Sequence, residues 1–265
     1  LLEEEKTFYD IVHRQDSCLP ETFALLSEME KEGLIGIDSG KIKLTAEGMT
    51  FCRENNIKEL GNVLCEACEA TGIVIEGEFK KILEEYKKIA ADRPKAVEKY
   101  DQGFISLEGV VKRVAFMYER GELSNAEIFV GGDDDLLSIV LALTGLPKRV
   151  VVVDIDERLT DLINKTADER GLPLEAFTHD LRYEFSDDIK KKFDVFVTDP
   201  VETVPGIKLF LSRCVSTLKG IGCSGYFGLT TLESSRKKWY EIERILFDMG
   251  FVITDIRRKF NIYPF

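Results

Sequence analysis

The sequence Ala126-Glu-Ile-Phe-Val-Gly-Gly-Asp-Asp-Asp135 constrains the fold of this chain more than any other stretch. Its apolar residues predict a buried parallel strand, and Gly131 and Gly132 predict a sharp turn. The three aspartates are expected to open the next helix. In doubly wound folds a small-molecule cofactor lies across such a turn, because glycine lets the backbone approach the ligand closely. The stretch therefore predicts a cofactor site.

Three adjacent carboxylates restrict the kind of cofactor. Asp133, Asp134 and Asp135 would repel a pyrophosphate at the helix N-terminus, which disfavours a dinucleotide site. A nucleoside that carries positive charge would be attracted, which favours a sulfonium compound such as S-adenosylmethionine or a relative. The alternative is that the acids only cap the helix and interact favourably with its dipole.

Composition excludes several other classes of protein. The 265 residues predict one large domain or two modest ones, and 44% hydrophobic residues suffice for a packed core. The sequence shows no apolar run near the roughly 18 residues of a membrane span and no signal-peptide pattern, although it begins at Leu1 rather than Met. Six cysteines in an ordinary core predict a reducing cytoplasm. The net charge of −12 disfavours nucleic acid and favours a cationic partner, or reflects solubility alone.

Residues 1–60 predict a small winged-helix module. Helices are expected at 3–15 and 20–31, followed by a hairpin over Leu34–Leu44 whose turn is Asp38-Ser39-Gly40. DNA binding is the obvious guess for such a fold, but thirteen acids against seven basic residues give the wrong charge for a duplex. We therefore expect a structural or dimerising module.

Residues 61–92 are expected to link this module to a second domain. They contain Cys65-Glu-Ala-Cys68 and a helix predicted at 77–91. Tetrahedral zinc needs four ligands, and the sequence has no second cysteine pair at suitable spacing; its only histidines are His13 and His179. We expect no metal site, and a zinc ion shared between subunits is the alternative.

From residue 126 onward strand and helix patterns alternate, which is typical of a parallel sheet with helices on both faces. Further strands are predicted at Arg149–Asp154, Leu174–Thr178, Phe193–Thr198 and Phe251–Asp255, and helices at 107–120, 157–170 and 233–249, with a last strand or tail from Arg257. We expect an α/β fold: a Rossmann-like, doubly wound sheet of the class I methyltransferase type over residues 93–265, preceded by the winged-helix module.

Carboxylates follow four consecutive strands at the same edge of this sheet. Asp154 ends the second strand, where an acid can accept hydrogen bonds from both ribose hydroxyls. Asp180 follows the third strand, where an acid can meet the adenine amino group. Asp199 follows the fourth strand; the alternative role for Asp199 is a cap for the helix expected near Gly206. Gln102 precedes the core strand and can reach over the cofactor, or belongs to a plain turn.

Taken together, these motifs resemble those of the branched-chain polyamine synthases, the bis(aminopropyl)spermidine synthases. The resemblance rests on Tyr100-Asp-Gln-Gly, Gly132-Asp-Asp-Asp, Thr144-Gly-Leu-Pro-Lys-Arg, Val153-Asp-Ile-Asp-Glu-Arg, Thr178-His-Asp-Leu, Phe193-Asp-Val-Phe-Val-Thr-Asp-Pro-x-Glu-Thr, Gly225-Tyr-Phe-Gly-Leu-Thr and Phe260-Asn-x-Tyr. It covers most of residues 62–265 and also fits the N-terminal module. The sequence departs from the family where Val201 replaces a second proline, and it ends soon after Tyr263, before any C-terminal segment that closes the site.

The resemblance implies transfer of the aminopropyl group of decarboxylated S-adenosylmethionine to the secondary amine of spermidine, which also yields methylthioadenosine. Asp133 and Asp134 would hold the ammonium of the donor, Asp199 would orient the attacking amine and take its proton, and Glu202 would bind a cationic arm. The cofactor-binding candidates are Gln102, Gly131, Gly132, Asp133, Asp134, Asp154 and Asp180, and the substrate-binding candidates are Tyr100, Asp199, Glu202 and Tyr226. We expect a cytoplasmic homodimer that binds neither nucleic acid nor membrane.

Two other classes of function remain open. An S-adenosylmethionine-dependent N-methyltransferase would share the Gly-Gly-Asp turn and Asp154. The adenine-amino methyltransferases, however, place a stacking aromatic ring after Asp/Asn-Pro-Pro, where this chain has Val201 and Glu202. A non-enzymatic winged-helix regulator is the other alternative, and it gives no purpose to the acids at the strand ends.

Overall fold

The structure is a computed structural model that describes residues 5–12, 17–57, 65, 67–68, 71–230 and 234–263. The chain divides into two compact units, Leu1–Leu64 with Thr230–Glu243 and Cys65–Leu229 with Arg244–Phe265. His13, both ends of the helix expected at 3–15 and Glu66 between the two linker cysteines lie outside the described residues.

The first unit contains a three-stranded antiparallel sheet and short helices. Its elements are β1 (Lys6–Thr7), α1 (Phe8–Val12), α2 (Leu19–Lys31), β2 (Ile35–Asp38), β3 (Lys41–Leu44) and α3 (Ala46–Glu54), with strand order β1-β3-β2. The predicted hairpin is confirmed: Ser39 and Gly40 both have positive φ, as a two-residue turn between twisted strands requires. Ile11, Leu26 and Ile42 are part of the small core of this unit.

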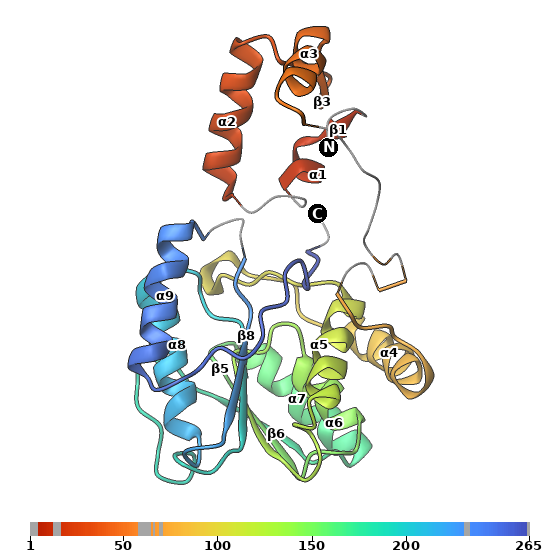
Figure 1. Cartoon of the computed structure of the whole chain (residues 1–265). Helices are drawn as coiled ribbons and strands as arrows, with labels where there is room; N and C mark the ends of the chain where they lie inside the picture. Colours follow the sequence, from red (N-terminus) through yellow and green to blue (C-terminus); the bar gives the residue numbers. More distant parts are fainter. Residues whose placement is uncertain are drawn as a thin grey trace. The chain divides into compact units, whose positions relative to one another are not determined.

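The second unit contains a five-stranded parallel sheet with the order β6-β5-β4-β7-β8 (Figure 1). The strands are β4 (Glu127–Gly131), β5 (Arg149–Asp154), β6 (Leu174–Thr178), β7 (Val195–Thr198) and β8 (Ser224–Phe227). In β5, Val150 to Val153 are all buried, as expected for a central parallel strand covered on both faces. The predicted α/β fold with a parallel sheet is confirmed.

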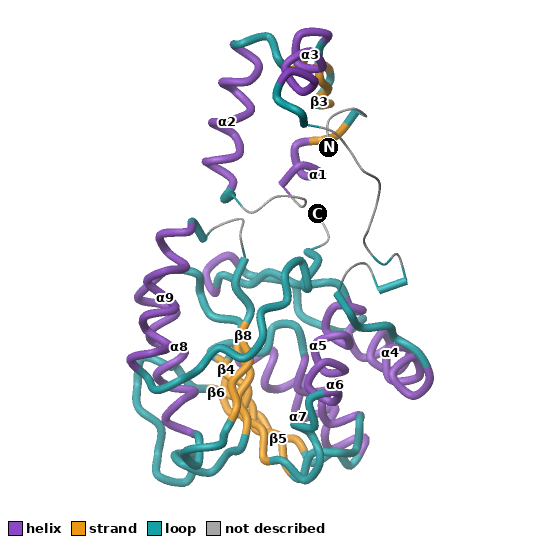
Figure 2. The backbone as a smooth tube through the Cα atoms, in the orientation of Figure 1, coloured by secondary structure: helices purple, strands orange, loops and turns teal. Residues whose placement is uncertain are grey.

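Helices cover both faces of this sheet (Figure 2). They are α4 (Gly77–Ala90), the short 3₁₀ helix η1 (Glu98–Tyr100), α5 (Leu107–Glu119), α6 (Leu137–Leu143), α7 (Glu157–Arg170) and α8 (Val204–Thr217), and α9 (Arg236–Asp248) spans the division between the units. α6 and α7 pack on β5 and β6, α4 and α5 pack on α6, and α8 packs on β4 and β7 from the other face. Among the helices of the described residues, none combines the length and apolar character that crossing a membrane requires.

The strand order reverses between β4 and β7, and this reversal places the site. The chain continues from β4 to its neighbour β5 on one side, whereas β7 lies against β4 on the other. The loops that leave these two adjacent strands therefore run to opposite faces and leave a crevice at their carboxyl ends. The Thr198 hydroxyl donates to the Gly131 carbonyl oxygen at 2.6 Å and ties the two strand ends together.

The prediction that the three aspartates open a helix is wrong. α6 begins at Leu137, and Leu136 before it has a left-handed backbone with φ of 56°. Asp133, Asp134 and Asp135 form a loop between strand and helix, because the turn at Gly132, with φ of 76°, is followed by this second left-handed residue. In contrast, β5, β6 and α7 have the predicted bounds.

The predicted strand at Phe251–Asp255 is also wrong, since these described residues belong to no strand. Phe251 packs edge-on against Phe196, with ring centroids 6.1 Å apart, but Val252 is 75% exposed. A strand on the edge of β8 would need a buried face formed by every second residue. Residues 251–255 lack such a face, because only Phe251 packs against the sheet. Residues 257–263 form a tail without regular structure.

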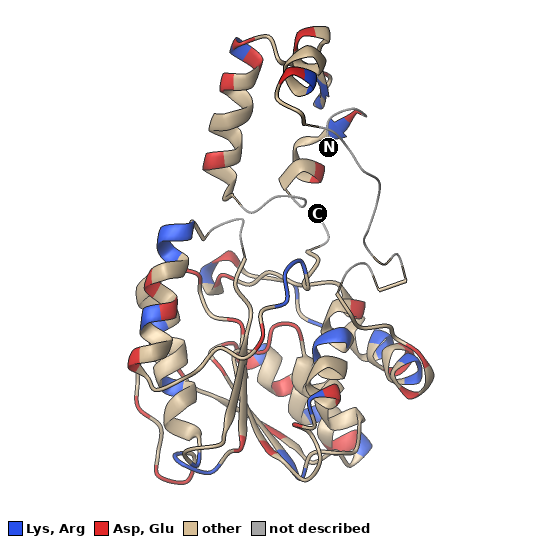
Figure 3. Cartoon of the chain, viewed as in Figure 1, with Lys and Arg blue, Asp and Glu red and all other residues tan. Residues whose placement is uncertain are grey.

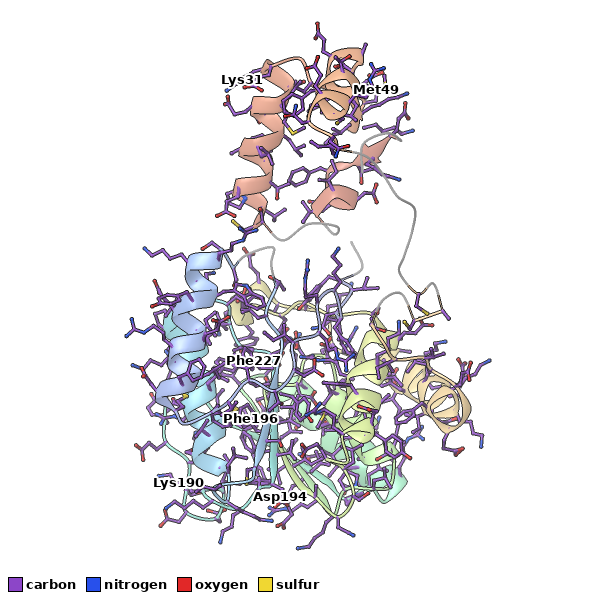
Figure 4. All side chains as sticks on the ribbon, viewed as in Figure 1. Lys31, Met49, Lys190, Asp194, Phe196 and Phe227 are labelled. Atoms are coloured by element: carbon purple, nitrogen blue, oxygen red, sulfur yellow. The ribbon has the colours of Figure 1, made fainter. Side chains whose placement is uncertain are left out.

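Close packing between β7 and β8 gives a testable prediction about stability. Figure 4 labels Phe196 on β7 and Phe227 on the neighbouring strand β8. A Cβ at Gly225 would lie 2.3 Å from Cζ of the buried Phe196 ring. Gly225→Ala should therefore lower the free energy of unfolding by about 1–3 kcal/mol, measured by chemical denaturation. In the control Gly36→Ala, at a strand glycine where an added methyl would meet nothing within 4 Å, stability should hardly change; equal effects would contradict the packing argument.

Candidate active site

The turn after β4 holds Asp133 as a buried helix cap. Its carboxylate accepts the backbone N–H of Leu137 at 2.7 Å and that of Ser138 at 3.2 Å, and its own N–H donates to Asp154 Oδ2 at 2.8 Å. Asp133 is 3% exposed, and burial raises its pKa well above the usual range. The contacts of Asp133 are thus largely with the backbone.

Asp134 and Asp135 have different surroundings. Asp134 is half-buried and accepts the backbone N–H of Gly103 at 3.0 Å. Burial raises its pKa, and repulsion by Asp135 and Asp199 adds to the shift. Asp135 is buried, accepts the Ile105 N–H at 3.0 Å and lies 3.8 Å from the guanidinium of Arg93. Asp135 is thus stabilised by a nearby guanidinium, whereas Asp134 accepts a backbone N–H.

Asp199 lies across the crevice at the end of β7. Its Oδ2 is 3.1 Å from Nη1 of Arg113 on α5, and this same nitrogen lies 3.7 Å from Oδ2 of Asp135. On the other side Gly228 is so close that a Cβ there would lie 2.2 Å from Asp199 Oδ1. Asp199 is not the helix cap: Thr203 caps α8, accepting the Gly206 N–H at 3.1 Å.

These groups line one pocket at the carboxyl ends of β4 and β7. Its walls include Arg113, Gly132, Val197 and Thr198 together with the four carboxylates at positions 133, 134, 135 and 199. Figure 3 shows acidic residues, in red, in loops at this edge of the sheet. Four carboxylates face the guanidinium of Arg113, with that of Arg93 beside Asp135, so the acids outnumber the cations and their ionised forms lack compensation. Such a pocket favours a cationic ligand.

Asp154 is the last residue of β5 and lies beside the turn after β4. Each of its carboxylate oxygens accepts one backbone N–H, from Asp133 and from Asp156, both at 2.8 Å. The backbone N–H of Ile155 also contributes, and a carboxylate with about four lone-pair sites keeps capacity to accept from a ribose hydroxyl. Gln102 joins this edge: its amide donates to Asp156 Oδ2 at 3.0 Å and accepts the Val97 N–H at 2.9 Å. Gln102 thus holds the preceding loop against the start of α7.

The remaining predicted residues are spread more widely. Asp180 pairs with Arg182, which lowers the pKa of Asp180. Tyr100, in η1, lies under the ammonium of Lys99 at 5.1 Å. The ring of Tyr226 meets Phe116, and burial and the nearby Glu122 raise the pKa of Tyr226 to about 12. The structure does not bring these three side chains into the pocket lining, and their binding roles stay predictions.

Arg113 and Tyr263 were missed as site residues. Tyr263 is near enough to Asp199 and Glu202 for their charges, together with burial, to raise its pKa. Its motif Phe260-Asn-x-Tyr is visible in the sequence, but nothing there places it beside Asp199. Arg113 carries a clearer signal, since it lies among the buried residues Val110 and Val114 on an apolar helix. A basic residue in such a stripe suggests a buried partner.

Metal ligands do not gather in the described part of the chain: no group of three or more His, Cys, Asp and Glu side chains there could hold a metal ion. Cys65 is exposed and Cys68 is buried, and the Cys68 thiol points to the Cys65 carbonyl oxygen at 3.9 Å. Whether these two thiols bind zinc stays the open alternative stated from the sequence.

Sequence comparisons identify relatives over almost the whole chain. The family model described as the branched-chain polyamine synthase A C-terminal domain matches residues 81–265. The N(4)-bis(aminopropyl)spermidine synthase of Thermococcus kodakarensis is 44% identical over 96% of this chain and 72% of its own length. The protein of the same name from Methanocaldococcus jannaschii is 42% identical over 97% of this chain and 73% of its own length.

Comparison of structures leads to the same family. The crystal structure of the branched-chain polyamine synthase from Thermus thermophilus, in complex with N4-aminopropylspermidine and 5′-methylthioadenosine, superposes with a TM-score of 0.86 at 35% identity, covering 98% of this chain and 73% of that one. A protein from Pyrococcus horikoshii described as a candidate RNA methyltransferase, with a TM-score of 0.51 at 15% identity over 68% of this chain and 85% of its own, shares the fold alone. The resemblance seen in the motifs is thereby confirmed: this chain belongs to the branched-chain polyamine synthase family.

Proposed function

We propose that this chain is an aminopropyltransferase that moves the aminopropyl group of decarboxylated S-adenosylmethionine to the secondary amine of spermidine. The observation that carries this proposal is the pocket in which four carboxylates meet at the ends of β4 and β7. Such a pocket suits an ammonium-bearing sulfonium donor and a polycationic acceptor. The family supports the same function, since the Thermus thermophilus relative holds a branched aminopropyl product and 5′-methylthioadenosine.

The reaction is a direct displacement. The lone pair of the secondary amine attacks the aminopropyl carbon bound to the sulfonium, the C–S bond breaks, and its electrons stay on sulfur as methylthioadenosine leaves. The nitrogen gives its proton to a carboxylate, and Asp199 is our candidate for this base. Asp199 and Asp135 are the two pocket acids beside a guanidinium, and Asp199 is the more exposed of the two. Holding donor and amine in line supplies much of the acceleration.

The two acids assigned to the donor ammonium have separate roles. Asp133 already accepts two backbone N–H groups of α6, which supports a structural role at the turn. Asp134 accepts one backbone N–H, and this single donor does not offset the cost of burying its charge, so its pKa is raised. An ammonium that binds beside Asp134 would therefore stabilise the ionised carboxylate. We assign the donor ammonium to Asp134, the ribose to Asp154, and an outer ammonium of the polyamine to Glu202.

The remaining assignments follow from the family and the sequence. We assign residues 93–265 to the catalytic domain, 61–92 to a linker and 1–60 to a winged-helix module that supports a homodimer. The order of helices and hairpin in the first unit supports the winged-helix assignment. The six free thiols support a reducing compartment, the cytoplasm.

Product analysis tests the proposed function directly. Incubation with decarboxylated S-adenosylmethionine and spermidine should yield methylthioadenosine and a polyamine heavier by one or two aminopropyl groups. Fragmentation in the mass spectrometer should place the addition on the internal nitrogen, because the proposed acceptor atom is the secondary amine of spermidine. A linear product, or a methylated product formed from S-adenosylmethionine instead, would contradict the proposal.

Kinetics of two variants separate the acids that follow β7. Asp199→Asn keeps the size of the side chain but cannot accept the proton, so kcat should fall by about a hundredfold or more. Methylthioadenosine affinity should survive, since we assign the nucleoside contacts to the ends of β4, β5 and β6. Glu202→Gln should mainly raise the KM for spermidine, because its charge acts in ground and transition states alike.

The control for these variants is Glu184→Gln, which removes a surface carboxylate paired with Lys190 at 2.9 Å. It should leave both constants near the wild-type values. Near-normal turnover in Asp199→Asn, measured at saturating donor with a spermidine titration, would show that Asp199 is only structural.

A further inference from the structure

Arg113 is the charged group that joins the two sides of the crevice. It lies on α5, and its side chain is only 12% exposed. The carboxylates that it meets come from different loops: Asp135 follows β4, and Asp199 follows β7. One guanidinium therefore links the two strand ends between which the strand order reverses.

The distances show which of the two carboxylates is the closer partner of Arg113. Asp135 is almost fully buried, and its Oδ2 is a buried oxygen with no hydrogen-bond donor among the described residues. A guanidinium placed only to neutralise a buried charge would bond to that oxygen. Arg113 instead approaches Asp199 Oδ2 at 3.1 Å and stays 3.7 Å from Asp135 Oδ2, although Asp199 is the more exposed acid. Its closer partner is thus the acid proposed to meet the substrate.

The backbone at Gly228 also limits the position of Asp199. A Cβ at Gly228 would lie 2.2 Å from Asp199 Oδ1 and 3.1 Å from Arg113 Nη2, so only glycine leaves room for this pair. Asp199 is held between a guanidinium and a bare backbone. A carboxylate fixed in this way can present its remaining lone pairs in one direction only.

We propose that Arg113 is a positioning residue for aminopropyl transfer: by bridging Asp135 and Asp199, it fixes the direction in which Asp199 faces the acceptor amine. This inference rests on the proposed function. It assigns Arg113 no contact with the reacting atoms, and it predicts that turnover depends on the reach and position of the guanidinium as well as on its charge.

The charges around this bridge determine the expected pH dependence. The titratable and charged groups around it are Asp134, Asp135, Asp199, Arg93, Tyr263, Glu202 and Tyr86, whose hydroxyl donates to the Asp135 carbonyl oxygen. Burial raises the pKa of Asp135, Arg113 opposes that rise, and Asp199 adds to it. Loss of the Arg113 charge must therefore raise the pH at which the pocket carboxylates ionise, and the acidic limb of the pH–rate profile moves to higher pH.

Three variants test the inference. In Arg113→Gln, kcat should fall about thirtyfold or more and the acidic limb should move up by about one pH unit, while methylthioadenosine affinity stays within about twofold. In Arg113→Lys, the limb should stay near its wild-type position because the charge remains, but kcat should still fall because the lysine side chain is one bond shorter and does not place its ammonium where Nη1 of Arg113 lies between the two acids. The control Arg149→Gln removes an arginine paired with Glu175 at 2.6 Å at the start of β5, and should change neither quantity.

The outcomes separate this inference from the proposed function. Wild-type kcat and an unmoved limb in Arg113→Gln, with branched product still formed by the wild type, would overturn the inference alone. If Arg113→Gln fails to fold, as thermal melting would show, Arg113→Lys decides: wild-type turnover in it would overturn the bridging role. A wild-type chain that forms no branched product would overturn the proposed function and the inference with it.

Discussion

Carboxylates held together against their mutual repulsion are the constraint on which this site depends. Three consecutive aspartates follow β4 after Gly132, and the fold supports each differently: helix N–H groups at Asp133, one loop N–H at Asp134, and guanidinium groups at Asp135. Asp199 joins them because the strand order reverses between β4 and β7. These contacts do not fully offset the burial of the charges: burial, and repulsion by Asp135 and Asp199, raise the pKa of Asp134. A cation that enters this pocket supplies the missing charge, which connects the fold to a polyamine chemistry.

Helices and strands of the second unit were predicted correctly where a local sequence pattern determines the structure. The apolar run of β5 predicts a central parallel strand, and α7 ends at Arg170, directly before Gly171, whose φ is 63°. The errors arose where tertiary packing decides. Leu136 takes a left-handed backbone that no propensity predicts, so α6 begins later than expected. Residues 251–255 are apolar enough for a strand, but the edge of β8 pairs with nothing from this segment.

The sequence predicted those site residues that lie at the ends of strands. Asp154 and Asp199 lie at the carboxyl ends of parallel strands, so sequence alone places them at one edge of the sheet. The separate roles of Asp133 and Asp134 were not predictable, because they depend on which backbone N–H groups the loop presents. Arg113 was missed for a related reason: its partner Asp199 is 86 residues away, and only the folded chain brings them together.

Ligand selection at Asp134 is the most direct test of the account. If the pocket is built for an ammonium, a carboxylate on the donor must be repelled. Calorimetry with the wild type should show decarboxylated S-adenosylmethionine binding about tenfold or more tightly than S-adenosylmethionine, and Asp134→Asn should narrow this difference. Equal affinities of the two donors for the wild type would contradict the account, because the cluster of carboxylates would then have no role in choosing the substrate.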